Sequence, residues 1–312
     1  MIFDSVLCTK TKAVEGGGID GALYTRNGEL IVSSLRYSKN AAHKHAAPYY
    51  ISPFHVKKIL KGKFVYCGHL HLHFGHFLME TLSSLWISEW VSNDVNFIFH
   101  PFYEGQGGLE SKQYIVDSLE LLGIDSQRIF IIKENVAFEN IIVPERLVAI
   151  NEAFNTSARF VYEKMVDRND VISADGKKIF LSRSKLSHGR RSYGHESKID
   201  SLFEGLGFSV VSPELISLKE QIALVNNADF VCGFEGSALH LSLFMKRTSK
   251  LISITENEHV NIGLCNKISG VRGVNINIKN ASPDEHLSII SQEINLIMRG
   301  QDCNRHKVLR KK

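Results

Sequence analysis

The sequence has no stretch of about 18 consecutive apolar residues, which is roughly the length that a helix needs to cross a bilayer. Its first residues, MIFDSVLCTKTK, lack a charged start followed by a long apolar segment, so no signal peptide is expected. Close cysteine pairs are also missing, because the five cysteines are scattered along the chain. An odd, dispersed set fits neither a disulfide framework nor a zinc site. We therefore expect a cytoplasmic protein that is neither secreted nor membrane-spanning.

A strong excess of one charge is absent as well. The formal net charge is only +4 over 312 residues, which gives little support for a nucleic-acid partner. Basic residues gather in the ending NRHKVLRKK, at 304–312. We interpret this ending first as a solvated terminus. The alternative is a peripheral contact with an anionic membrane surface at its inner face.

What is present is an alternation of strand-like and helix-like segments. Residues 1–60 read as short strands separated by glycine and Asn-Gly turns, with RNGE at 26–29 as a hairpin signal. Strands then alternate with helices, and after residue 150 the alternation becomes a regular βαβ series. This pattern predicts an α/β protein that has a β-rich start and a parallel sheet covered by helices on both faces. We place the domain boundary near residue 150, which gives domains at 1–150 and 151–312.

Three polar segments follow predicted strands, and ligands of parallel sheets bind at the carboxyl ends of the strands. These segments are GHFLME at 75–80, SRSKLSHGRRSYGHE at 182–196 and GFEGSALH at 233–240. The second segment opens a helix at Glu196 and carries several cations, namely Arg183, Lys185, His188, Arg190, Arg191 and His195. A cationic loop that leads into a helix N-terminus is suited to hold phosphates. The alternative is an ordinary solvated loop.

The third segment places a carboxylate, Glu235, in a glycine-rich turn where an anion would be expected. Gly233 and Gly236 permit close approach of a ligand, and Ser237 is positioned to cap the following helix. A carboxylate beside a diphosphate would be repelled. We therefore expect Glu235 to accept hydrogen bonds from sugar or ribose hydroxyls, while the backbone N–H groups of Gly236 and Ser237 face the anion. The alternative is that Glu235 pairs with an arginine of the basic loop.

His76 and Glu80 are four residues apart, so they share one face of the predicted helix. Because that helix follows a strand directly, its first turn should project towards a ligand, where a general base would be useful. The polar face could instead meet water. Just before it, the alternation HLHLH places His69, His71 and His73 on one face of a predicted strand. Packing or a place at the rim of a pocket is a better interpretation of this triplet than a metal site.

Taken together, these three segments resemble glycosyltransferase family 61, whose bacterial members include capsule and lipopolysaccharide biosynthesis proteins. The resemblance spans about residues 65–255, with the order of the segments intact. It implies a GT-B arrangement of two Rossmann-like domains with a cleft between them. It also implies metal-independent, inverting transfer of a sugar from a nucleotide-sugar donor to a glycan or lipid-linked glycan, without a cofactor. The sequence contains no Asp-x-Asp pair, a common signature of a diphosphate-bound cation.

The resemblance implies roles for individual residues. Glu80 or His76 would remove the proton of the acceptor, with Glu80 ranked first and Glu235 next in line. Donor-binding residues would be Arg183, Arg190, Arg191, Glu196, Gly233, Glu235, Gly236, Ser237 and His240. The chain departs from the usual family pattern at His195, Glu235 and Ser237. These departures support an alternative function, a non-catalytic carbohydrate- or nucleotide-binding protein on the same fold.

Overall fold

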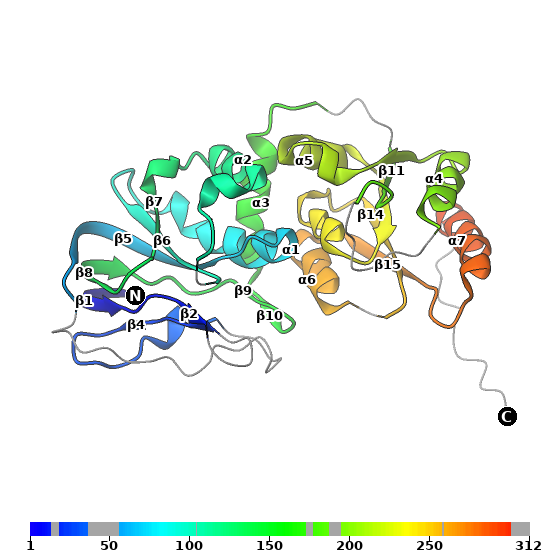
Figure 1. The fold of residues 1–312 in the computed structure, drawn as a ribbon. Coiled ribbons are helices and arrows are strands. Elements are labelled where there is room, and N and C mark those ends of the chain that lie inside the picture. The colour runs from blue at the N-terminus through cyan, green and yellow to red at the C-terminus, as the bar shows by residue number, and fades with distance from the viewer. Residues whose placement is uncertain are drawn as a thin grey trace. The chain divides into compact units, whose positions relative to one another are not determined.

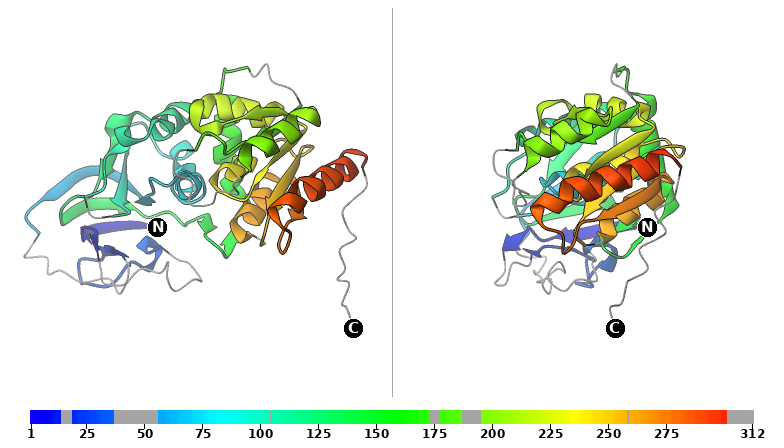
Figure 2. Two further views of the ribbon diagram at one scale, coloured as in Figure 1. Left: turned by 45° about the vertical axis from the view of Figure 1, so that its right-hand side comes forward. Right: turned by 90° about the vertical axis from the view of Figure 1, so that its right-hand side faces the viewer.

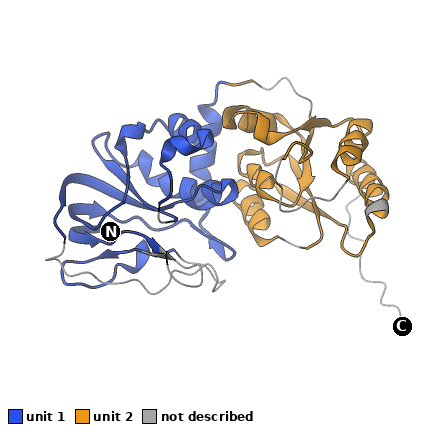
Figure 3. Cartoon of the chain, in the orientation of Figure 1, with its two compact units in different colours: residues 1–170 blue, residues 171–312 orange. Residues whose placement is uncertain are grey.

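The computed structural model describes residues 1–13, 19–36, 56–103, 105–172, 177–186, 195–257 and 259–300. The chain divides into two compact units, Met1–Asp170 and Val171–Lys312 (Figure 3). This division comes later than the boundary that we expected near residue 150. Helix α3 (Arg159–Asp167) packs on α2 (Gln113–Leu122) and on the 3-10 helix η5 (Leu82–Glu89), so it belongs with the first unit.

The first unit is built on a mixed six-stranded sheet with the strand order β4-β1-β8-β5-β6-β7 (Figure 1). Strands β5 to β8 run parallel to their neighbours within that group, whereas β1 is antiparallel to β4 and β8. Two short hairpins, β2-β3 and β9-β10, complete the strands. The strands are β1 (Ile2–Cys8), β2 (Lys12–Ala13), β3 (Ile19–Asp20), β4 (Leu23–Tyr24), β5 (Ile59–Leu70), β6 (Asn96–Pro101), β7 (Ile129–Ile131), β8 (Val136–Ile142), β9 (Val148–Ala149) and β10 (Ala153–Phe154).

The β-rich start is confirmed within the described residues. The predicted turn at 26–29 follows β4, where the Thr25 N–H donates to the Glu29 carbonyl and Gly28 adopts a φ of 85°.

The helical segments of this unit are η1 (Val32–Ser34), α1 (Phe74–His76), the π-helical turn η4 (Phe77–Thr81), η5, η6 (Leu109–Ser111), α2, η7 (Ser126–Arg128), η8 (Thr156–Ala158) and α3. The helix predicted after β5 is therefore present, but it changes pitch twice along its length.

Apolar side chains from β1, β5, β6 and β8 form the core of the first unit. Val6, Phe64, Ile98 and Phe138 are at most 4% exposed and belong to one cluster. Phe64 and Phe138 meet edge to face, with ring centroids 5.0 Å apart. This cluster fixes β5 in the middle of the sheet, so the carboxyl end of β5 lies between β8 and β6.

The second unit contains the parallel sheet that the βαβ rhythm predicts. Its strand order is β12-β11-β13-β14-β15, and every neighbouring pair is parallel. The strands are β11 (Lys178–Leu181), β12 (Ser209–Val211), β13 (Phe230–Phe234), β14 (Lys250–Thr255) and β15 (Arg272–Asn277). The helices are α4 (Glu196–Gly205), η9 (Pro213–Leu215), α5 (Leu218–Asn227), the 3-10 helix η10 (Ser237–Phe244), α6 (Val260–Ser269) and α7 (Pro283–Met298). Of these helices, η9 and α6 were not predicted.

Helices cover both faces of this second sheet (Figure 2). On one face, Phe203 of α4 stacks on Phe180 of β11 with centroids 3.8 Å apart, and Ile290 and Ile294 of α7 join the same cluster. Helix η10 packs against α5, α6 and β13. Among the described residues no helix is both long and apolar enough to span a membrane. Their four cysteines are buried free thiols, as the scattered positions predict.

Candidate active site

The sheet order of the first unit creates a switch point at β5. The chain continues from β5 to β6 on one side, while β8 lies on the other side of β5. Ligand sites of open α/β sheets lie at such points, beyond the carboxyl ends of the strands. The segment that leaves β5 here is His71–His73, which leads directly into α1 and η4.

The prediction that His69, His71 and His73 lie on one face of a strand is wrong, because the strand ends at Leu70. At the end of the strand, a side-chain hydroxyl takes the place of a neighbouring strand as hydrogen-bond partner. The Thr81 Oγ1 donates to the His69 carbonyl and accepts from the His71 N–H, both at 2.9 Å. His69 then stacks on His100 of β6, whereas His71 packs on Phe102. The three histidines therefore do not share one face, and only His71 enters the group around Glu80.

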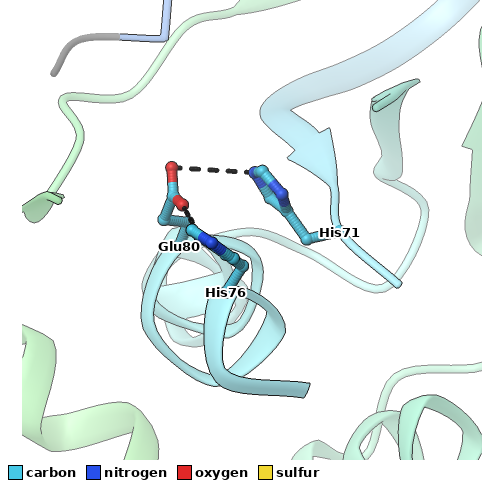
Figure 4. Close-up of side chains that lie close together, drawn as sticks. All are labelled: His71, His76 and Glu80. Atoms are coloured by element: carbon cyan, nitrogen blue, oxygen red, sulfur yellow. Dashed lines mark hydrogen bonds and ion pairs between the residues drawn. The ribbon is translucent and has the colours of Figure 1, made fainter. Parts of the chain in front are cut away.

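The carboxylate of Glu80 is the centre of a buried polar cluster (Figure 4). Its Oε1 lies 2.7 Å from His76 Nδ1, so the two residues share one face of the helix, as the four-residue spacing predicts. The guanidinium of Arg36 donates to both oxygens, from Nε to Oε2 at 2.7 Å and from Nη2 to Oε1 at 2.8 Å. His71 Nε2 lies 3.6 Å from Oε2. The Glu80 side chain is 5% exposed, whereas that of His76 is 31% exposed.

The electrostatics of the cluster keep Glu80 ionised. Burial alone raises the pKa of this carboxyl, but hydrogen bonds from His76 and Arg36, together with the charge of Arg36, outweigh it and hold the pKa well below its usual range. Burial lowers the pKa of His71 to about 3, so that ring is neutral at neutral pH. The cation that stabilises the carboxylate is therefore Arg36, which also lies over the Phe102 ring at 5.3 Å. A carboxylate held so firmly in its ionised form is a weak proton acceptor.

A second arginine, Arg146, lies close to the same cluster and follows β8. Its Nη2 donates to the Ser34 carbonyl at 3.2 Å. Gly68 makes room for it: a Cβ at this position would lie 2.8 Å from Arg146 Nη2, and its φ of +81° also favours glycine. Sequence reasoning missed Arg36, Arg146 and His71 as partners of Glu80. The glycine inside a strand pattern at Gly68 was the one available signal of a close approach.

His71, His76 and Glu80 each offer a ligand atom, and these atoms lie within 4.8 Å of one another, close enough to hold a metal ion. The contacts of Glu80 argue against that use. Arg36 donates to both of its oxygens and adds a positive charge beside them, whereas a carboxylate ligand must direct a lone pair to the metal. The cluster is better suited to orient the His76 ring than to bind a cation.

The second unit has its own switch point, between β11 and β13. Strand β12 lies on one side of β11 and β13 lies on the other, and Leu181 pairs with Gly233 near the carboxyl ends. Two predicted site residues meet there, because Arg183 Nη1 donates to the backbone carbonyl of Glu235 at 3.3 Å. Arg183 thus lies beside the glycine turn.

The Glu235 side chain is buried. Its Oε2 accepts a hydrogen bond from the Thr255 hydroxyl, and its Oε1 lies 3.8 Å from His259 Nε2. His240, another predicted site residue, is also buried, and its Nδ1 lies 3.1 Å from the Ser237 carbonyl. Thr255 and His259 were not predicted, since they come from the end of β14 and from the start of α6, the helix that sequence reasoning missed.

The glycine turn differs from the expected arrangement at the cap of its helix. Gly236 has a φ of 162°, an extended conformation that any residue can adopt, and it stands at the N-cap of η10. Ser237 is the first helical residue, and the helix has no side-chain cap, so the predicted cap is wrong. Gly233 is closely packed, because a Cβ there would lie 3.0 Å from Leu239 Cδ2.

The remaining predicted residues of the basic loop lie mostly outside the described residues. Arg190 and Arg191 belong to residues 187–194, for which no position is described, and so does His188. Glu196 is the first residue of α4, preceded by His195 at the N-cap. The basic chain ending at 304–312 also lies outside the described residues.

One comparison places most of these residues in a known protein family. Residues 74–252 match the family model described as Glycosyltransferase 61, which is more than half of the chain. The matched span begins at α1, includes His76 and Glu80, and ends within β14. Arg36 and His71 lie before it. A search of curated proteins returned no match.

Proposed function

Because the chain belongs to glycosyltransferase family 61, we propose that it transfers a sugar from a nucleotide-sugar donor to a hydroxyl of a growing surface glycan, with inversion at the anomeric carbon. The observation that carries this proposal is the pairing of His76 with an ionised, buried Glu80 at the end of β5. The resemblance to capsule and lipopolysaccharide biosynthesis proteins supports the choice of acceptor. In a GT-B arrangement, the first unit would receive the acceptor and the second unit the donor.

His76 is the general base in this proposal, which reverses the order that the sequence suggested. With its proton on Nδ1, the ring donates to Glu80 Oε1 and presents the lone pair of Nε2 as the proton acceptor. The ring is partly exposed, so a substrate hydroxyl is able to reach it. As the acceptor oxygen bonds to the anomeric carbon, its proton moves to His76, and the bond from that carbon to the diphosphate breaks with its electron pair on the leaving oxygen.

Glu80 is a positioning residue in this mechanism. It fixes the tautomer and orientation of His76, and it stabilises the imidazolium that forms when the ring takes a proton. Arg36 keeps Glu80 ionised, so the proton stays on the imidazole after transfer. Glu235, the other candidate base, is engaged by Thr255 in the second unit. We therefore assign it to the donor side, as an acceptor of hydrogen bonds from ribose or sugar hydroxyls.

On the donor side, Arg183 is the described cation that we assign to the leaving diphosphate. It lies at the β11/β13 switch point beside the turn at Gly236. Arg190 and Arg191 are proposed to join it, with the N-terminus of η10 supplying backbone N–H groups. Fixed positive charges would then stabilise the negative charge of the leaving diphosphate, which is the role of a divalent cation in metal-dependent transferases. The proposal therefore includes no metal and no cofactor.

The test is turnover with a panel of UDP-, GDP- and CMP-linked sugars, measured as release of the nucleotide and as a mass increase of added oligosaccharides. We expect turnover with at least one donor, and the same rate after addition of excess chelator. Thermal stabilisation by a nucleotide sugar without product would identify a non-catalytic binding protein instead. Loss of activity with chelator that a divalent ion restores would return His71, His76 and Glu80 to a metal site.

A further inference from the structure

A groove in the first unit, outside the cluster around Glu80, has the composition of a sugar-binding surface. It encloses about 600 Å³ and is lined by residues of η5, η8 and α3, with Trp90 directly after η5. We call it the tryptophan groove. Its lining combines three aromatic side chains, three carboxylates and two cations, namely Trp86, Trp90, Phe160, Glu89, Glu163, Asp167, Lys164 and Arg168. Its volume is within the usual range of small-molecule sites.

Two of the three aromatic side chains of this groove are unusually exposed. Trp90 is 77% exposed and Phe160 is 68% exposed, although rings of this size are usually largely buried. The chain has only two tryptophans, and both of them line the groove. Trp86 is fixed in place because its Nε1 donates to the Glu145 carbonyl at 3.2 Å. Exposed rings gathered in one hollow indicate a surface that meets a partner.

The charged side chains limit what that partner can be. Glu89 pairs with Lys164, Glu163 pairs with Arg159, and Asp167 adds a third carboxylate to the lining. Lys164 and Arg168 also line the groove, so its charges are nearly balanced and provide no positive field to hold a nucleotide diphosphate or an anionic membrane surface. The groove suits a neutral saccharide, whose ring has apolar C–H faces that pack on aromatic rings and a rim of hydroxyls that donate to carboxylates.

The groove is also continuous along the chain with the proposed base. Helix η5 begins at Leu82, directly after the π-helical turn η4 that carries Glu80, and it carries Trp86 and Glu89 on its following turns. Binding energy from parts of a substrate far from the reacting atom contributes to orientation at the reacting centre. We propose that the tryptophan groove binds neutral sugar units of the acceptor glycan, remote from the hydroxyl that reacts. This inference rests on the proposed function for its choice of ligand.

Since both tryptophans line the groove, indole fluorescence of the full chain reports on it directly. The experiment titrates the protein with maltohexaose, laminarihexaose and chitohexaose, without any donor. We expect a saturable change with at least one of them. Phe160→Ala keeps both tryptophans and should weaken the affinity for the saccharide about tenfold. Phe160→Tyr should restore that affinity. Leu215→Ala, which alters an equally exposed apolar residue of the second unit, should leave it unchanged.

The outcomes separate this inference from the proposed function. No saturable change with any saccharide, or equal affinity in Phe160→Ala, overturns the groove assignment even if transfer is intact. Saccharide binding without transfer for any donor supports the groove and contradicts the proposed enzyme. A blue shift with phosphatidylglycerol vesicles, but with none of the saccharides, assigns the groove to a membrane surface and also overturns the inference.

Discussion

Arg36 and Glu80 form a two-point ion pair in which Nε and Nη2 donate to the two carboxylate oxygens, at 2.7 and 2.8 Å. Their side chains are 2% and 5% exposed. The pair joins the β-rich start of the chain to the helix that carries His76, across 44 residues of sequence. It therefore links the stability of the first unit to the ionisation of the residue that positions the proposed base.

Breaking this pair from one side should be costly. Glu80→Gln or Arg36→Met leaves a charge buried without its partner, and each should lower the free energy of unfolding by about 3 to 5 kcal/mol. The double variant should lose much less free energy of unfolding than the two single variants lose together. Urea unfolding of the three variants measures this coupling. Lys63→Met, which breaks the exposed pair with Asp94, is the control and should cost little. Additive losses would contradict a coupled buried pair.

The buried histidines predict that acid destabilises the first unit. Burial lowers the pKa of His71 to about 3 and that of His100 to about 4, from an ordinary value of 6.5. Between pH 6.5 and the lowered pKa of each ring, that histidine binds a proton in the unfolded chain but not in the folded chain. The free energy of unfolding is therefore highest above pH 6.5 and falls as the pH drops. The slope approaches about 1.4 kcal/mol per pH unit for each histidine.

The measurement for this prediction is the free energy of unfolding at about pH 6 and about pH 5. His100→Asn should reduce the difference between the two pH values by the contribution of one histidine, whatever it does to the stability at either pH. In the folded protein, the His100 Nδ1 lies 2.7 Å from the Tyr66 hydroxyl and the Nε2 lies 2.8 Å from the Thr9 carbonyl. An unchanged pH slope in the variant would show that His100 does not resist protonation.

Arg183 is expected to hold the donor diphosphate. Arg183→Ala should weaken the binding of a nucleoside diphosphate by roughly 2 to 3 kcal/mol, because a charge-assisted hydrogen bond is lost. Calorimetry with UDP and GDP provides the measurement. Arg247→Ala is the matched control, since this exposed arginine precedes β14 and so lies at the amino end of that strand. Equal affinities in the two variants would move the diphosphate away from Arg183.

Much of the fold follows from local sequence patterns. The βαβ rhythm predicted the parallel sheet of the second unit, and Ser217 with Glu220 forms the capping box that starts α5. Helix α6 was missed, since its apolar residues are spread around the helix rather than gathered on one face. The division into units was placed too early because α3 is held by packing on α2 and η5, which sequence alone does not reveal.

The candidate site was predictable only where its partners are close in sequence. The spacing of His76 and Glu80 was enough to predict that they share a helix face, because four residues make about one helical turn. Arg36 and Arg146 reach Glu80 and its neighbours through tertiary packing, and no local pattern announces them. If Arg36 is left out of account, the Glu80 carboxylate is the natural choice of base. The Arg36 guanidinium makes Glu80 a weak proton acceptor, which is the physical reason to prefer His76.

The most direct test of this account is the turnover of His76→Gln, measured with the donor that the sugar-nucleotide panel identifies. Glutamine is close in size but takes no proton, so turnover should fall by about 10² to 10⁴ while donor affinity is retained. His286→Gln, an identical change on α7 of the second unit, should leave turnover close to that of the unaltered protein. If His76→Gln retains turnover within about twofold of the unaltered protein, His76 is not the base and the proposed mechanism is contradicted.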